Sequence, residues 1–285
     1  MKNNILLFFT LFIFVNTNAQ HQFKGVWSGI IYKKTINKGE PIHLSFFIID
    51  NIVNGYSKKE KFKKNDFITK KTIGKTRNDT LFCKEVSVIS EIKRSRNQKK
   101  YKEFKLVYND TTGYLNGSCK DITNKGDVDS LILYRTDYNY NPLKNTPKSH
   151  SWFSRLKEDL KNGYYSPMKR EIERKEFQFI PIYFDHDKAE IKNKYDVFLK
   201  KMIRVVNGHT DLRIKVIGHT DSDGTDAYNV ELSKRRAKSL IKYFTKNGIS
   251  SDKIEIDFKG EKEPVDTNKT KQGKQKNRRV DFSFI

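Results

Sequence analysis

The sequence predicts an α+β protein in which an all-β domain, a barrel or a sandwich, precedes an α/β domain. Three observations lead to this prediction. The chain has 285 residues, which is long for one compact domain and comfortable for two. Residues 23–134 carry short apolar runs separated by polar turns, with little helical periodicity. From Phe177 onward, strand-like and helical patterns alternate. We therefore expect an all-β domain in residues 20–136, a linker in 137–176 and an α/β domain in 177–285.

Residues 1–19 have the pattern of a secretory signal peptide. Lys2 precedes an apolar run from Ile5 to Val15, and the small residue Ala19 comes before Gln20. The run is short for a helix that spans a bilayer, so an uncleaved anchor is only the alternative. No cysteine lies near the expected cleavage site, so a lipid anchor is not indicated. We expect the protein to be exported.

Eight strand-like segments follow, and their number and spacing suit a small antiparallel barrel or sandwich. They are Val26–Tyr32, Ile42–Ile49, Val53–Tyr56, Phe67–Ile73, Thr80–Ile89, Tyr101–Tyr108, Gly113–Ser118 and Asp129–Tyr134. Several are shorter than the roughly nine to eleven residues of a membrane-spanning strand, and lysines interrupt many, so a membrane barrel is the alternative. Over a short stretch, Gly25 and Trp27 resemble the Gly-x-Trp start of lipocalin-like barrels.

The chain has two cysteines, Cys83 and Cys119, both in the part that is expected to be exported. Oxidation is permitted there, and both residues lie in strand-like segments. A single disulfide and two buried thiols are therefore the two alternatives.

Residues 137–176 differ in composition from the segments on either side. Asn, Pro, Lys and Ser are frequent between Asn139 and Ser149, which is typical of a linker. Ser151 is a good N-cap for a short helix that Asn162 and Gly163 would end. This helix carries a Trp and a Phe, which predicts that it packs on one of the two domains.

The α/β domain is predicted to have the element order βαβαββ around a mixed sheet. The expected elements are a strand over Phe177–Phe184, a helix from Tyr195 to Val206, a strand over Leu212–Ile217, a helix from about Ala227 to Asn247, and strands at Ile254–Phe258 and Val280–Phe284. Thr225 or Asp226 is a good N-cap for the second helix. Residues 268–277 are basic and are expected to be partly helical.

The residues with the most distinctive chemistry lie in the loop Gly218–Gly224 and on the helix that follows it. Asp221 is on the loop. At about 100° per residue, Asn229 and Arg236 fall together at the border of the apolar face of the helix. An acid and a planar cation suit a ligand that has both an ammonium and a carboxylate group. The alternative is a structural ion pair between Asp221 and Arg236.

This stretch resembles the signature of the OmpA-like peptidoglycan-binding domain, GHTDxxG followed by NxxLSxxRA. Three further segments resemble the same family and extend the resemblance over residues 177–285. They are Phe184–Ala189, similar to FDxDKA, Lys259–Pro264, similar to GxGExxP, and Asn277–Val280, similar to NRRV.

The resemblance implies a ligand and the residues that hold it. The signature Asp and Arg fall on Asp221 and Arg236, which would grip the amino and carboxylate groups of meso-diaminopimelate in the peptidoglycan stem peptide. Thr220 belongs to the same expected site, and Asp187 and Asn229 would lie beside the ligand. Helix capping and loop bracing are the alternatives for these last two residues.

The formal net charge is +23, with +16 in residues 1–176 (34 basic minus 18 acidic) and +7 in residues 177–285 (23 minus 16). This charge suits anionic partners, which include nucleic acid, phospholipid surfaces and cell-wall polymers. Because the N-terminus predicts export, we expect no nucleic-acid partner. The α/β domain has histidines but no cysteine and no HExxH or GxSxG pattern, so neither a metal, a cofactor nor an enzymatic activity is expected.

The sequence therefore predicts a non-catalytic envelope protein that binds peptidoglycan and tethers the outer membrane or an envelope partner to the cell wall. The resemblance places it in the periplasm or cell outer membrane, with the α/β domain facing the periplasm. Two alternatives are a porin-like outer-membrane barrel with a periplasmic wall anchor and a wall-targeted, lipocalin-like protein that binds a small ligand.

Overall fold

The computed structural model describes residues 22–61, 66–91, 100–123, 128–136 and 151–285. They form two compact units that divide between Met168 and Lys169. The predicted signal peptide and the linker residues 139–149 lie outside the described residues. Among the helices that are described, none has the length and apolar character needed to cross a membrane.

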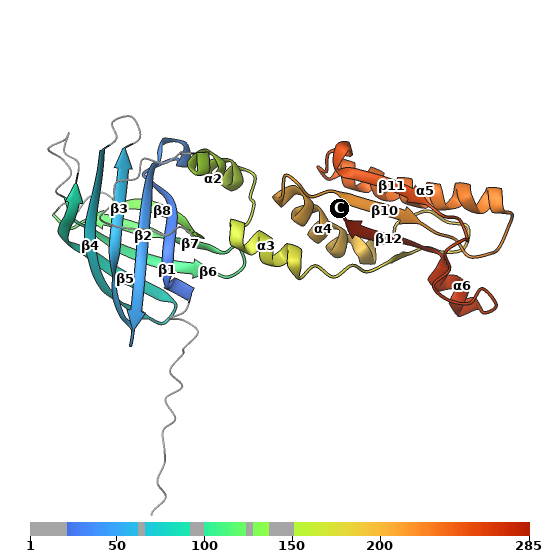
Figure 1. Ribbon diagram of the computed structural model, residues 1–285, viewed down its shortest axis with the longest axis horizontal. Coiled ribbons are helices and arrows are strands. Elements are labelled where there is room, and N and C mark those ends of the chain that lie inside the picture. Colours follow the sequence, from blue (N-terminus) through green and yellow to red (C-terminus); the bar gives the residue numbers. More distant parts are fainter. Residues whose placement is uncertain (1–21, 62–65, 92–99, 124–127, 137–150) are drawn as a thin grey trace, which may run out of the picture. The chain divides into compact units, whose positions relative to one another are not determined.

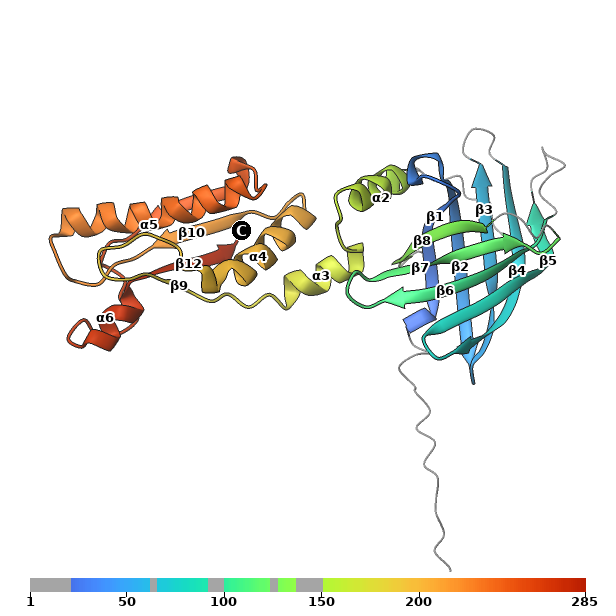
Figure 2. The same ribbon diagram turned by 180° about the vertical axis from the view of Figure 1, so that it is seen from behind.

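The N-terminal unit is a closed barrel of eight antiparallel strands (Figures 1 and 2). The strands are β1 (Gly25–Tyr32), β2 (Glu40–Ile49), β3 (Ile52–Lys61), β4 (Asp66–Arg77), β5 (Thr80–Glu91), β6 (Lys102–Asn109), β7 (Tyr114–Asp121) and β8 (Val128–Thr136), with a 3₁₀ helix at Ile36–Lys38. Each strand pairs with the next, and β1 also pairs with β8, so the sheet has no unpaired edge. The predicted all-β domain is confirmed, and of the two predicted alternatives, a barrel or a sandwich, it is the barrel.

Alternation along the strands places a cluster of apolar side chains in the barrel interior, and the barrel also buries a polar group in which Ser57 and Lys70 donate to Glu85. Trp27, Leu44, Phe46, Leu81 and Leu106 are fully buried in one cluster. Such an interior differs from the polar, water-filled lumen of a porin. The Trp27 indole satisfies its polar group by donating from Nε1 to the carbonyl oxygen of Phe23 at 2.9 Å. The packed interior therefore resembles a protein core and not a channel.

Cys83 and Cys119 are both buried free thiols, so the possible disulfide is not formed. The strand register explains why. Cys83 on β5 and Cys119 on β7 both lie opposite Phe104 on the intervening strand β6. Two strand spacings separate them by about 10 Å, whereas a disulfide needs Cα atoms within about 7 Å.

We predict that oxidised preparations of the exported protein keep two free thiols per chain. Burial raises the pKa of Cys119 to about 12 and also raises the pKa of Cys83, so both react slowly while the barrel is folded. Titration with a thiol reagent in denaturant and without reductant should count two thiols. A count of zero would show that the barrel opens far enough to join them.

The predicted helix after the barrel is α2 (Ser151–Lys161). Its apolar residues Phe153 and Leu156 are buried together with Ile30 and Tyr114 of the barrel. This helix therefore packs on the outside of the barrel.

A second helix, α3 (Pro167–Lys175), was not predicted. Pro167 occupies the first helical position, where its fixed φ and missing N–H are well tolerated. The remaining residues are mostly charged, so the segment lacks the apolar periodicity that indicates a helix in a sequence.

The C-terminal unit is built on a four-stranded mixed sheet in the order β11-β10-β12-β9 (Figure 1). The strands are β9 (Ile182–Tyr183), β10 (Ile214–Gly218), β11 (Ile254–Phe258) and β12 (Arg279–Phe284). β10 and β11 are parallel, whereas β12 is antiparallel to both β10 and β9. The predicted mixed sheet is confirmed.

The first strand of this sheet is shorter than predicted. Only Ile182 and Tyr183 pair with β12, although the apolar run begins at Phe177. The rings of Phe177 and Phe179 pack against the Phe284 ring at centroid distances of 5.1 and 4.7 Å. The apolar character of this segment therefore reflects ring packing and not strand pairing.

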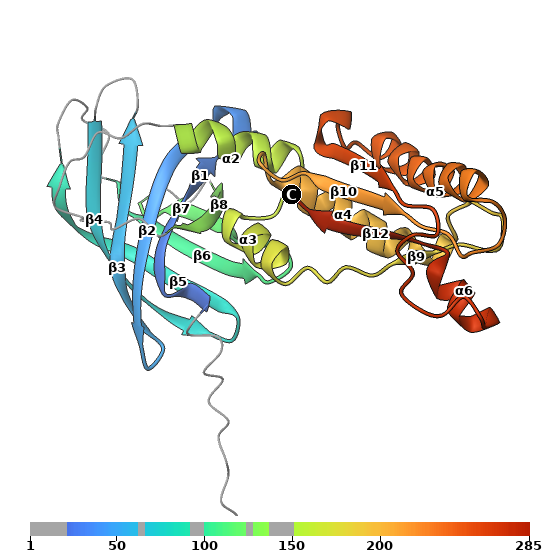
Figure 3. The same cartoon turned by 45° about the vertical axis from the view of Figure 1, so that its right-hand side comes forward.

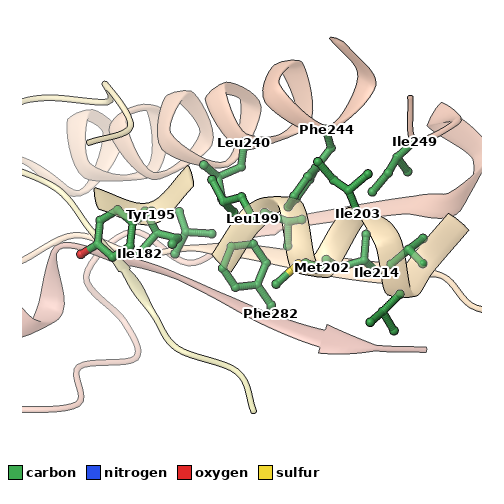
Figure 4. Close-up of a cluster of buried hydrophobic side chains, with 14 of the residues drawn as sticks. Ile182, Tyr195, Leu199, Met202, Ile203, Ile214, Leu240, Phe244, Ile249 and Phe282 are labelled. Carbon is green, nitrogen blue, oxygen red and sulfur yellow. The ribbon is translucent and has the colours of Figure 1, made fainter. Parts of the chain in front are cut away.

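The helices of this unit are α4 (Asp196–Gly208), α5 (Asp226–Lys246) and α6 (Lys271–Asn277), with 3₁₀ helices at Asn193–Tyr195 and Ser251–Lys253. α4 and α5 share one buried cluster with the sheet, in which Leu199, Met202, Leu240 and Phe244 meet Phe282 (Figure 4). The predicted N-cap of α5 is formed by Thr225, whose side chain accepts from the backbone N–H of Tyr228.

Candidate functional site

The loops that carry the predicted site converge at one edge of the C-terminal sheet. Gly218, the last residue of β10, lies opposite Phe258, the last residue of β11, and also opposite Val280 near the start of β12. Val280 in turn lies opposite Ile182 on β9. β9, β10 and β11 run in one direction and β12 runs in the other. The loops that follow β9, β10 and β11 therefore lie at the same edge of the sheet as the segment that precedes β12.

Asp221, on the loop after β10, is almost completely buried, with 3% of its surface exposed. Its Oδ2 accepts from Nη1 of Arg278 at 2.6 Å, and its Oδ1 accepts from the backbone N–H of Asp223 at 3.4 Å. Arg278 comes immediately before β12. The ion pair of Asp221 is therefore made with Arg278 and not, as spacing alone suggests, with Arg236.

Arg236, on α5, is fully buried, although the sequence places it at the border of the apolar face. Its guanidinium donates from Nε to the carbonyl oxygen of Lys188 at 2.9 Å, from Nη1 to that of His219 at 3.0 Å and from Nη2 to that of Asp185 at 3.1 Å. The group also lies over the Phe184 ring, 5.4 Å from its centroid. Arg236 therefore joins the loop after β9 to the loop after β10.

The charge on Arg236 is maintained despite its burial. Burial lowers the pKa of Arg236 to about 10, and the nearby carboxylate of Asp221 acts in the opposite direction. The guanidinium is thus cationic at neutral pH. Three of its five N–H groups are used by backbone carbonyls, so it retains donors for a further acceptor.

Thr220 and Asn229 bring buried acceptors to the same place. Thr220 is 1% exposed and Asn229 is 0% exposed. Both pack against Gly260, and the backbone N–H of Thr220 donates to the Gly260 carbonyl oxygen at 2.8 Å. Asn229 donates from Nδ2 to Oε2 of Glu261. Within the described part of the chain, Oγ1 of Thr220 and Oδ1 of Asn229 have no hydrogen-bond partner. A buried acceptor without a donor is costly, which favours a ligand donor at this position.

Asp187 lies on the surface at the edge of the site. Its φ of 55° is in the left-handed region, which Asp tolerates better than most residues. Its carboxylate accepts from the hydroxyl of Tyr228 and lies 3.9 Å from Nη2 of Arg235. These contacts brace the loop after β9 against the first turns of α5.

His186, Asp221 and Asp223 each offer one potential metal-ligand atom, and these atoms lie within 4.8 Å of one another. However, both carboxylates already pair with cations, Asp221 with Arg278 and Asp223 with Lys274. A divalent ion would have to compete with two fixed positive charges, so this cluster does not suit a metal.

The structure brings together four of the five residues that the sequence predicts for the site, and the fifth, Asp187, lies at its surface edge. The sequence analysis assigned no role to Arg278. Arg278 lies in a segment that resembles the family, yet its role depends on β12 lying directly beside β10. The signal available in the sequence is the basic pair Arg278–Arg279 at the start of the last strand.

Comparison with known proteins identifies the class to which this unit belongs. The model of the OmpA family matches residues 183–278, a range that contains all the site residues described above. Most of the C-terminal unit is therefore similar to the OmpA family.

Several relatives of this domain have the names of envelope proteins. Outer membrane protein A of Bordetella avium is 36% identical over 103 residues, which cover 36% of this chain and 53% of that protein. The peptidoglycan-associated lipoprotein of Buchnera aphidicola is 28% identical over 160 residues, which cover 56% of this chain and 82% of that protein. The peptidoglycan-binding protein ArfA of Mycobacterium tuberculosis is 33% identical over 103 residues, which cover 36% of this chain and 31% of that protein. The chain thus spans about half the length of the first relative and about a third of the last.

Among solved structures, the peptidoglycan-associated lipoprotein from Burkholderia pseudomallei is similar to this chain at 26% sequence identity. The similarity covers 37% of this chain and 89% of that one, with a TM-score of 0.36.

We predict that Arg236→Ala lowers the free energy of unfolding of the C-terminal unit by about 3 kcal/mol or more, because three buried carbonyls lose their donor. Urea unfolding followed by far-UV circular dichroism measures this loss. Both tryptophans, Trp27 and Trp152, lie in the N-terminal unit, so their fluorescence serves as an unchanged reference. Arg235→Ala is the matched control and should cost less than about 0.5 kcal/mol. Equal stability of the two variants would contradict the bracing role of Arg236.

We predict that His219 titrates near pH 4. Burial is the main cause that lowers its pKa to about 4, and the neighbouring charge of Arg279 adds to it. The unfolded chain binds this proton below about pH 6.5, whereas the folded chain does not until about pH 4. Stability should therefore fall by about 1–3 kcal/mol as the pH drops through this window. NMR titration of the histidine rings, assigned with His219→Gln, measures the pKa, and a midpoint near 6.5 would contradict the prediction.

Proposed function

We propose that this protein binds peptidoglycan non-covalently through its C-terminal unit and thereby attaches its barrel to the cell wall. The observation that carries this proposal is the cluster around Asp221. Here a buried carboxylate and the unpartnered acceptors of Thr220 and Asn229 lie at the same sheet edge as the guanidinium groups of Arg236 and Arg278.

The proposed ligand group is the meso-diaminopimelate of the stem peptide. Its free end carries an ammonium and a carboxylate on one carbon atom. The ammonium offers three donors, which suit the oxygens of Asp221, Thr220 and Asn229. The carboxylate suits the remaining N–H groups of Arg236, because a planar guanidinium matches a carboxylate in geometry and charge. The names of the relatives, which include peptidoglycan-binding and peptidoglycan-associated proteins, support the same ligand class.

We propose that this binding takes place without cleavage. The titratable side chains at the site are held in structural contacts: Asp221 pairs with Arg278, and Asp223 pairs with Lys274. His219 is buried and has a pKa of about 4, which makes it a weak base at neutral pH. These arrangements hold charges in place and do not activate a nucleophile.

We further propose that the protein is exported to the periplasm or the cell outer membrane, with the C-terminal unit facing the periplasm. The relatives named above are outer-membrane or peptidoglycan-associated proteins, which supports this location. The porin-like alternative gains no support from the barrel, because a packed apolar cluster occupies its interior and the buried charges of Lys70 and Glu85 pair with each other.

One observation favours a second candidate function, binding of a small anionic ligand by the barrel. A cavity of about 500 Å³ is lined by Ile31, Lys34, Lys38, Lys59 and Asp129, among other residues. Its basic walls suit an anionic group, although Lys59 already pairs with Glu40 at 2.7 Å.

We predict that the mature chain sediments with insoluble peptidoglycan sacculi and that Asp221→Asn weakens this binding at least about 30-fold. The neutral amide leaves the ligand ammonium without its counter-charge, a loss of about 2–5 kcal/mol. Co-sedimentation at a series of protein concentrations measures the change, with circular dichroism to check that the variant is folded.

Arg235→Ala is the control and should bind almost normally, because Arg235 lies about 100° away from Arg236 on α5. Failure of the unmodified chain to sediment with sacculi would contradict wall binding. Release of soluble fragments from the sacculi would contradict the absence of cleavage.

A further inference from the structure

One face of the barrel exposes large apolar side chains next to lysines. The apolar members, from β2 to β5, are more than one third exposed, and the lysines come from β4, β5 and β6. We call this set the apolar–lysine face, and it consists of Phe47, Ile49, Ile52, Ile73, Phe82, Lys75, Lys84 and Lys105. Single exposed apolar residues are common on protein surfaces, but a group on adjacent strands is typical of an interaction site.

The strand register shows that these side chains form rows across the barrel wall. One row runs from Ile49 and Ile52 through Lys75 and Phe82 to Lys105. The alternation of exposed Ile52, Phe82 and Lys84 with buried Val53 and Cys83 places the rows on the outside of the barrel.

A second row runs from Phe47 through Asn54 and Ile73 to Lys84 and Glu103. Between the two rows lies a groove of about 610 Å³, whose walls include Ile52, Ile73 and Phe82. Apolar and cationic side chains alternate along the first row from Ile52 to Lys105, whereas the second row contributes two exposed apolar side chains and one lysine beside a polar and an acidic residue.

The tip of this face is held in a fixed conformation. Asp50 and Asn51, which join β2 to β3, have φ angles of 48° and 66°, as in the tight two-residue turns of hairpins. Thr76 of β4 donates from its backbone N–H to the Asn51 carbonyl oxygen at 2.9 Å and from its hydroxyl to Asn51 Oδ1 at 2.8 Å. Ile49 and Ile52 directly flank this turn. The hairpin of β2 and β3 is visible in the wall of the barrel (Figure 3).

The charge on this face points to an anionic partner. Within the described residues, Lys75, Lys84 and Lys105 have no acidic group within ion-pair distance, and Glu103 pairs with Lys120. The centre of a protein–protein interface is usually depleted in lysine. A bilayer surface with anionic lipids accepts the same combination, because apolar side chains enter the headgroup region while lysines contact phosphate groups.

We propose that the apolar–lysine face docks the barrel on the surface of a bilayer that contains anionic phospholipid. Ile49 and Ile52 at the tip enter the headgroup region, and Lys75, Lys84 and Lys105 contact lipid phosphates. The proposal rests on the proposed function only in placing the exported protein beside a membrane. It gives the barrel a partner of its own, separate from the peptidoglycan site of the C-terminal unit.

The test uses the mature full-length chain with two kinds of vesicle, phosphatidylcholine alone and phosphatidylcholine mixed with phosphatidylglycerol. The chain should sediment with the anionic vesicles only, and added salt should weaken the binding. Lys75→Gln combined with Lys84→Gln should weaken it about 25-fold, or about fivefold for each lysine. Ile49→Ser should weaken it about tenfold through the loss of one buried apolar side chain.

The matched control for charge is Lys238→Gln combined with Lys242→Gln, two exposed lysines on α5. The matched control for the apolar change is Val197→Ser, since Val197 is 81% exposed on α4. Both controls should bind vesicles like the unmodified chain.

Three results would overturn the proposal: equal sedimentation with both kinds of vesicle, equal losses in the face variants and their controls, or no vesicle binding at all. A concentration-dependent dimer that Ile49→Ser abolishes would instead assign the face to a second copy of the chain. Sacculus binding is measured on the same variants and should not change, so failure of membrane docking can be distinguished from failure of wall binding.

Discussion

The buried guanidinium of Arg236 is the interaction on which the geometry of the proposed wall-binding site depends. Its N–H groups hold carbonyl oxygens from the loop after β9 and from the loop after β10, and its charge lies close to the carboxylate of Asp221. Burying this cation without hydrogen bonds would be very unfavourable, so the two loops are held where their carbonyls meet it. The same contacts fix the loop that carries Thr220 and Asp221. Structural bracing and ligand binding are therefore not competing roles for Arg236, because the brace positions the acid that is proposed to meet the ligand.

The two units differ in how they present charge. In the C-terminal unit, cations and carboxylates are paired in a buried cluster, which suits a small ligand group with both charges. On the barrel, lysines alternate with exposed apolar side chains over several strands, which suits an extended anionic surface. Neither arrangement needs a channel through the barrel, whose interior is occupied by side chains. The structure is thus consistent with an adaptor that has one surface for the wall and another for a membrane.

Periodicity made most of the fold predictable from the sequence. The alternation of inward apolar and outward polar residues located all eight barrel strands, and the spacing of apolar residues located α4 and α5. Features that depend on which strands become neighbours could not be predicted. Cys83 and Cys119 are separated because β6 lies between their strands, and Arg278 reaches Asp221 because β12 pairs with β10. The complete burial of Arg236 could not be predicted either. A projection down the helix axis places Arg236 at the border of the apolar face, but it does not include the loops after β9 and β10 that cover this border.

The central claim is that the site recognises an ammonium and a carboxylate together, and one calorimetric comparison tests it most directly. Two soluble stem peptides would be titrated into the mature chain, one with meso-diaminopimelate and one with lysine at the same position. Lysine keeps the ammonium but lacks the neighbouring carboxylate. The site described here predicts that the diaminopimelate peptide binds at least about 30-fold more tightly, since the lysine peptide leaves the Arg236 guanidinium without its partner. Equal affinity for the two peptides, or no binding of either, would contradict the claim.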